Sequence, residues 1–316
     1  MQKEKNNTHH QNDSIDEIEF QEIFKIILQE KWSIISITTT LSIIGLIFSL
    51  FLPNIYESKA LLAPVNQSSS ISSTIRSYSG IAGIAGISLP SDKDDGNYAK
   101  AIKKVNTLSF FENSILPNIY LPNLMAFRSW DSDTNSIFYD ENIYNIKNNI
   151  WLAYDQNSQK KIPSAQECFE VFKTKHFNII EDTKSGFITL SIKHKSPFIA
   201  KQWAELVLNE VNAFYREKDK AESQKAMEYL NQQITSANLS ELKQVLVQLL
   251  QEETKKLTLI EANKFYVFDY IDPPAVMEKK LEPNRTKVFI LCVILGLAIG
   301  LFWVLLRHYF FKEKFT

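Results

Sequence analysis

Few side chains in this 316-residue sequence are spaced for catalysis or for metal binding. Asp131 and Asp133 form an Asp-x-Asp pattern, which can hold a divalent cation against a nucleotide sugar. The pattern lies in a stretch rich in Asn, Ser and Asp, and such residues favour turns, so we interpret it as a turn. Cys168 and Cys292 match none of the Cys and His spacings of zinc sites. The sequence therefore predicts a protein that is not an enzyme, with no catalytic residue, no metal site and no cofactor.

Three closely spaced glycines are the most unusual local feature. Gly80, Gly83 and Gly86 recur every third residue, although the whole chain contains eight glycines. No Gly-Lys-Ser/Thr sequence follows them, so this is not a phosphate-binding loop. Glycine permits close backbone approach, which leaves two interpretations. The segment is a flexible or packed loop, or it contacts another subunit or a polymer.

Two uncharged apolar runs, at residues 33–52 and 288–306, determine where the other segments of the chain lie. Each has about the 20 residues that a helix needs to cross a bilayer. Lys25 and Lys31 precede the first run, and Arg307, Lys312 and Lys314 follow the second. Basic residues gather on the cytoplasmic side, so both termini are expected there. We predict a cytoplasmic N-terminal segment over 1–32, an external domain over 53–287 and a cytoplasmic tail over 307–316.

Small residues in the two runs offer a surface for helix contact. Gly296 and Gly300 in the second run form a small-xxx-small pattern, and Gly45 and Ser49 in the first run have the same spacing. We favour pairing between the two spans. Contact with a neighbouring protomer or with a polymerase is the alternative.

The first part of the external segment predicts a strand and several helices. Alternating residues over 56–65 predict the strand, while 98–115 is expected to be helical. Ile143, Ile146 and Ile150 have helical spacing, which predicts a helix over 140–152. Ser164 and Glu167 form a capping box for a helix that ends near Lys175.

A hairpin is expected next, with strands over 176–181 and 187–194. His176 and His194 lie at the outer ends of these strands and are interpreted as surface residues. The net charge of −1 gives no reason to expect nucleic acid as a partner.

A long helical hairpin over 198–263 dominates the rest of the external segment. Ser196 and Pro197 start its first helix, and the stripe of Trp203, Val207, Val211 and Phe214 predicts a buried face. Residues 216–228 are polar all round, so this part should project into solvent or run beside another subunit.

Asn238 with Glu241 is expected to cap the second helix. The apolar stripe of that helix predicts contacts within the hairpin or between protomers: Leu242, Leu246, Leu249, Leu250, Leu257 and Ile260. A strand over 265–271 follows.

Four segments together resemble the Wzz family of polysaccharide chain-length determinants, or polysaccharide co-polymerases. They are the amphipathic entry to the first span over 15–32, the strand YESKALLAPV after it, and residues 181–217 and 239–289. The last segment contains the helix, the strand and the proline-containing approach to the second span. Residues 98–161 carry no part of the resemblance.

The resemblance implies an α+β fold, in which two transmembrane helices flank a periplasmic α/β base domain with a long projecting helical hairpin. It implies a non-enzymatic regulator that forms homo-oligomeric rings in the bacterial inner membrane. The partners would be a Wzy-type polymerase and the polysaccharide or its lipid-linked form, as in O-antigen lipopolysaccharide.

Two alternatives remain open. One is a capsule or exopolysaccharide co-polymerase that works with a separately encoded tyrosine kinase, because this sequence has no nucleotide-binding loop. The other is a sensor, but neither cytoplasmic segment offers an output module.

Overall fold

The structure is a computed structural model that describes residues 25, 27–65, 96–152 and 162–312. The chain forms two compact units, Met1–Asn54 with Leu281–Thr316 and Ile55–Lys280. Gly80, Gly83 and Gly86 lie outside the described residues, so their predicted role stays a prediction.

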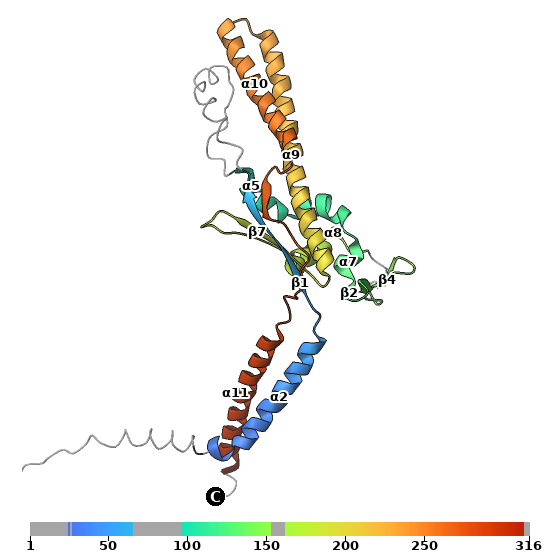
Figure 1. Cartoon of the computed structure of the whole chain (residues 1–316), viewed down its shortest axis with the longest axis vertical. Coiled ribbons are helices and arrows are strands. Elements are labelled where there is room, and N and C mark those ends of the chain that lie inside the picture. The colour runs from blue at the N-terminus through green and yellow to red at the C-terminus, as the bar shows by residue number, and fades with distance from the viewer. Residues whose placement is uncertain (1–24, 26, 66–95, 153–161, 313–316) are drawn as a thin grey trace, which may run out of the picture. The chain divides into compact units, whose positions relative to one another are not determined.

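The first unit contains two long apolar helices that lie side by side, α2 (Lys31–Phe51) and α11 (Arg285–Lys312) (Figure 1). Their most apolar windows have mean hydropathies of 2.2 and 3.0, and only 17% of each window is buried. A core helix of a soluble protein would be buried, so exposed apolar surface of this length favours a membrane environment. Both helices extend slightly beyond the uncharged runs, which places Lys31 and Arg285 at helix ends.

The second unit is built on a four-stranded antiparallel sheet with strand order β6-β7-β1-β8. Its strands are β1 (Tyr56–Pro64), β6 (Phe177–Glu181), β7 (Ile188–His194) and β8 (Phe268–Asp272). The predicted hairpin and the strand after the first span are confirmed. In β7, Ile188, Leu190 and Ile192 are buried together, as their alternation predicts.

Helix α9 (Pro197–Ser236) packs against β1 and β7 with its first turns. Trp203, Val207 and Val211 are almost fully buried in the same core as β7, and Phe214 packs on it half-buried. The predicted apolar stripe is therefore confirmed. With 40 residues, α9 is about 60 Å long at ~1.5 Å per residue, so it extends well beyond the sheet.

The segment between β1 and β6 consists of short elements. Three helical pieces cover most of the expected helix over 98–115: α5 (Gly96–Val105), α6 (Leu108–Phe110) and η1 (Phe111–Ile115). The helical prediction is confirmed, but Thr107 breaks it by capping α6 with its hydroxyl. Further along the chain lie η2 (Leu116–Asn118) and α7 (Leu121–Met125).

The helix expected over 140–152 is wrong. Residues 140–152 instead contain a small strand pair, β4 (Tyr144–Asn145) with β5 (Ile150–Trp151). A second pair, β2 (Phe127–Asp131) with β3 (Ser136–Tyr139), lies just before it in the chain. The Asn145 side chain accepts hydrogen bonds from the backbone N–H groups of Lys147 and Asn148, and Asn149 has a positive φ of 55°. Asn side chains that bind nearby backbone compete with helix formation, which overrides the isoleucine spacing.

The capping box is confirmed at the start of α8 (Ala165–Val171). The Ser164 N–H donates to Glu167 Oε2 at 2.7 Å, and the Glu167 N–H donates to Ser164 Oγ at 3.3 Å. A short π-helix, η3 (Phe172–His176), continues the helix to β6.

Helix α10 (Ser240–Ala262) returns along α9 and completes the predicted hairpin (Figure 1). The expected cap at Asn238 is wrong, because Leu239 occupies the N-cap position and no side chain caps the helix. Asp219 and Ser223 in the polar stretch of α9 are buried. This stretch therefore runs beside α10 of its own chain, and a second subunit is not needed to cover that face.

Candidate functional site

The small residues of α2 and α11 lie where the two helices approach most closely. A Cβ atom on Gly45 would lie 2.2 Å from Cys292 Sγ, and one on Gly296 would lie 2.9 Å from the Thr38 Cα. A Cβ on Gly300 would lie 3.3 Å from Ile34 Cγ2. Ser49 is buried as well. The structure thus brings the predicted glycines between the two spans of one chain, and any side chain there would push the helices apart.

Three hydroxyl groups of α2, those of Thr38, Thr40 and Ser42, donate to backbone carbonyls of the same helix. Thr38 Oγ1 donates to the Ile34 carbonyl at 2.8 Å, and Ser42 Oγ donates to the Thr38 carbonyl at 2.7 Å. Such back-bonding makes hydroxyls tolerable in lipid. Near one end of the pair, Arg307 lies 3.8 Å from the Glu30 carboxylate.

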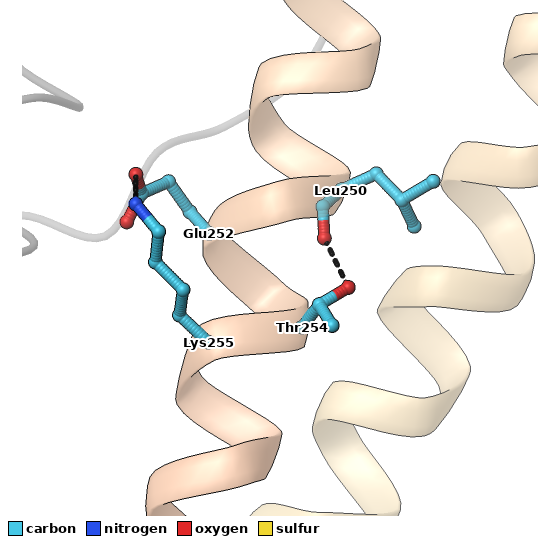
Figure 2. Close-up of polar contacts among 4 residues, drawn as sticks. All are labelled: Leu250, Glu252, Thr254 and Lys255. Carbon is cyan, nitrogen blue, oxygen red and sulfur yellow. Dashed lines mark hydrogen bonds and ion pairs between the residues drawn. The ribbon is translucent and has the colours of Figure 1, made fainter.

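The predicted leucines of α10 differ in their burial. Leu246 is buried, while Leu242, Leu249, Leu250 and Leu257 are half-buried. Figure 2 shows the Leu250 side chain pointing toward the neighbouring helix.

The same view shows how the two sides of α10 differ. Glu252 and Lys255 pair at 3.0 Å on the side away from the neighbouring helix, and Thr254 Oγ1 donates to the Leu250 carbonyl at 2.7 Å (Figure 2). Leu246 and Leu250 therefore hold the hairpin together, and the outer side of α10 is largely polar.

Asn212 joins the base of the hairpin to the sheet, and the sequence analysis missed it. Its Oδ1 accepts hydrogen bonds from the N–H groups of Tyr266, Val267 and Phe268 at 3.2, 2.8 and 3.1 Å. Its Nδ2 donates to the Phe268 carbonyl at 3.2 Å. The N–H groups of Tyr266 and Val267 bind Asn212, and β8 begins after them at Phe268 and not at the expected residue 265. In the sequence, the only sign of this role was a polar residue, Asn212, next to the apolar stripe of α9.

Asp219 makes a second buried contact between α9 and the segment before β8. Tyr266 donates its hydroxyl hydrogen to Asp219 Oδ2 at 2.6 Å. Burial, with a smaller effect of the Asp219 charge, raises the pKa of the nearby Tyr215. Together with Asn212, this contact fixes the direction in which the hairpin leaves the sheet.

The interpretation of His176 and His194 as surface residues is wrong. His194 is 2% exposed, and its ring lies 5.4 Å from that of half-buried His176 and 5.0 Å from Trp203. Its Nδ1 accepts from the Ser196 N–H at 3.0 Å, so Nε2 carries the hydrogen and donates to the Asn123 carbonyl at 3.1 Å. The sequence places these residues at strand ends, but α9 and the 96–152 segment cover those ends.

Burial determines the charge state of both rings. Loss of hydration lowers the pKa of His194 to about 3, and the charges of His176 and Lys195 act in the same direction. The pKa of His176 is lowered mainly by burial as well. Both histidines are therefore neutral structural residues at physiological pH.

The Asp131 carboxylate and the Cys168 thiol have structural roles and not catalytic ones. Asp131 accepts from the Asp133 N–H at 3.1 Å and from Thr134 Oγ1 at 2.7 Å, and these bonds lower its pKa. This is the geometry of a turn. Burial raises the pKa of Cys168 to about 11, so its thiol is protonated and unreactive. Within the described residues, no group of three or more His, Cys, Asp or Glu side chains could hold a metal ion.

Comparisons with known proteins give one family model and many solved structures, including the two described next. The family model for Wzz, chain length determinant protein, matches residues 16–105. A structure described as a full-length bacterial polysaccharide co-polymerase is 13% identical, with a TM-score of 0.39, over 93% of this chain and 98% of the other. A fragment of WzzB, a polysaccharide co-polymerase from Salmonella Typhimurium, is 11% identical, with a TM-score of 0.30, over 72% of this chain and all of the fragment.

No curated protein sequence is significantly similar to the chain. The family match covers nearly all of the entry to the first span, the span itself and the strand after it. The entry and the strand are two of the four segments that carried the resemblance in the sequence. The resemblance to this family is confirmed over residues 16–105, which match the model of the Wzz family of chain length determinant proteins.

Proposed function

We propose that this protein controls the length of a bacterial surface polysaccharide, of the O-antigen lipopolysaccharide type, without catalysing its synthesis. The match of residues 16–105 to the chain length determinant family carries the proposal. In this proposal, α2 and α11 anchor the chain in the inner membrane with both termini in the cytoplasm. Ile55–Lys280 lies in the periplasm and acts as a homo-oligomer beside a Wzy-type polymerase.

The hairpin supports an assembly role because its outer side remains open. Leu246 is buried within the chain and Leu250 points toward the neighbouring helix (Figure 2), whereas Leu259 on α10 is 52% exposed. An exposed leucine on the largely polar outer side of this helix is available to a second subunit. Substituting Leu246 or Leu250 would disturb the hairpin itself, so a test of contacts between protomers should target Leu259.

Gene deletion followed by complementation tests the function. We expect the deletion strain to lose its modal glycan length on a lipopolysaccharide gel and the wild-type gene to restore it. A deletion strain whose lipopolysaccharide and capsular glycans keep their length distributions would refute the proposal.

A Leu259→Glu variant tests the assembly. A charge at an interface core is unfavourable, so we expect fewer cross-linked oligomers and a shifted modal length at normal protein levels. Gln248→Glu on the same helix is the matched control, because it adds the same charge at an exposed polar position. If Leu259→Glu and Gln248→Glu cross-link equally, Leu259 does not contribute to contacts between protomers.

A further inference from the structure

The turn of the long hairpin contains a cavity of about 280 Å³ between the end of α9 and the start of α10. It is lined by Tyr229, Gln233 and Ser236 from α9, by Asn238 from the turn, and by Leu242 and Leu246 from α10. Leu246 is buried and forms an apolar floor, while Tyr229 is 52% exposed at the rim. The cavity thus combines one aromatic ring, an apolar floor and a polar edge.

The polar edge can both donate and accept hydrogen bonds. Gln233 and Asn238 carry carboxamides, each with two N–H donors and one carbonyl acceptor, and both side chains are exposed. No side chain caps α10, so the first N–H groups of that helix remain available beside the cavity. None of the residues that line the cavity is charged.

We propose that this cavity binds a neutral saccharide unit of about one sugar ring. A sugar ring has apolar C–H faces and hydroxyl groups that donate and accept at its edges. The Tyr229 ring and the leucine floor match the faces, and the carboxamides and free N–H groups match the hydroxyls. The volume agrees, because it lies just under the ~300 Å³ at which pockets for drug-sized ligands begin.

Other classes of ligand fit less well. A carboxylate or phosphate would find no Lys or Arg among the lining residues. A helix from another protein would need an apolar groove with anchors along several turns, whereas this cavity is one short concavity at the turn. The inference deepens the proposed function, since it gives the hairpin a direct contact with the glycan whose length is controlled.

Binding to the full-length protein tests the site. The protein is purified in a detergent without a sugar headgroup, and the probe is delipidated polysaccharide from the bacterium that carries the gene. Saturation-transfer NMR detects contact, and titration calorimetry measures affinity. Tyr229→Ala and Gln233→Ala should each weaken binding about fivefold to tenfold, the loss expected for one stacking surface or one to two hydrogen bonds.

Two variants serve as matched controls. Tyr229→Phe keeps the ring, and Gln232→Ala removes an exposed carboxamide that does not line the cavity, so both should bind like the wild type. Circular dichroism establishes that each variant is folded. The proposal is overturned if the wild type does not bind, or if Tyr229→Ala and Gln233→Ala bind as tightly as the controls.

The outcomes separate this site from the proposed function. If those two alanine variants reduce cross-linking between chains but leave glycan affinity unchanged, the cavity holds a second copy and the saccharide site is refuted. A deletion strain with unchanged glycan length refutes chain-length control whatever the binding result. A deletion phenotype without glycan binding refutes the saccharide site alone.

Discussion

Mild acid should destabilise the protein through His194, whose ring is buried and neutral in the folded state. Its pKa falls from an ordinary value of 6.5 to about 3 on folding. The unfolded chain therefore binds more protons than the folded chain between these two values, and stability is lost as the pH falls below 6.5. The full stability difference is about 5 kcal/mol, of which about 2 kcal/mol is lost by pH 5.

Thermal unfolding of the full-length protein in detergent, followed by circular dichroism, measures this loss. For a domain of this size, 2 kcal/mol corresponds to a midpoint about 4–8 °C lower at pH 5 than at pH 7.5. The window from pH 6.5 to 5 avoids Asp131 and Asp182, whose lowered pKa values place their titration at lower pH.

His194→Gln isolates the contribution of His194, because Gln cannot titrate. This variant will be less stable at pH 7.5, since a buried hydrogen-bond network is disturbed. Its midpoint should nevertheless change less between pH 7.5 and 5 than that of the wild type. His176→Gln measures the smaller contribution of the neighbouring ring. The reasoning is refuted if the wild type and His194→Gln lose stability equally over this range.

Three further predictions follow from other contacts. Asn212→Ala should lower the unfolding free energy by about 2–4 kcal/mol, measured by urea denaturation, because it leaves three buried N–H groups without their acceptor; a loss below 1 kcal/mol would contradict this. Gly45→Ala should lower the melting midpoint in detergent, and adding Cys292→Ala should recover part of the loss by removing the sulfur that the new Cβ meets; equal midpoints for the single and double variants would argue against that packing. Ser164→Ala should cost about 1 kcal/mol through loss of the capping box, whereas Ser132→Ala, at an exposed turn, should leave the denaturation midpoint unchanged.

Local patterns predicted much of this fold because they act within a few residues. The apolar runs identify α2 and α11, since crossing a bilayer depends on length and composition alone. The stripe of Trp203, Val207 and Val211 identifies the buried side of α9, since helical spacing places these residues on one face. The helix expected over 140–152 failed because Asn145 and Asn149 bind or bend the backbone locally.

Only the tertiary structure decided how distant segments meet. His194 is at the end of a strand in the sequence, but the start of α9 and the carbonyl of Asn123 enclose it. Asn212 binds backbone more than 50 residues away, a contact that no periodicity encodes. The polar stretch of α9 is likewise explained by α10 of the same chain. The sequence by itself determined the two apolar helices and the helices of the long hairpin, because their causes are local. The buried polar contacts and the cavity at the hairpin turn depend on long-range packing, so they could be known only from the folded chain.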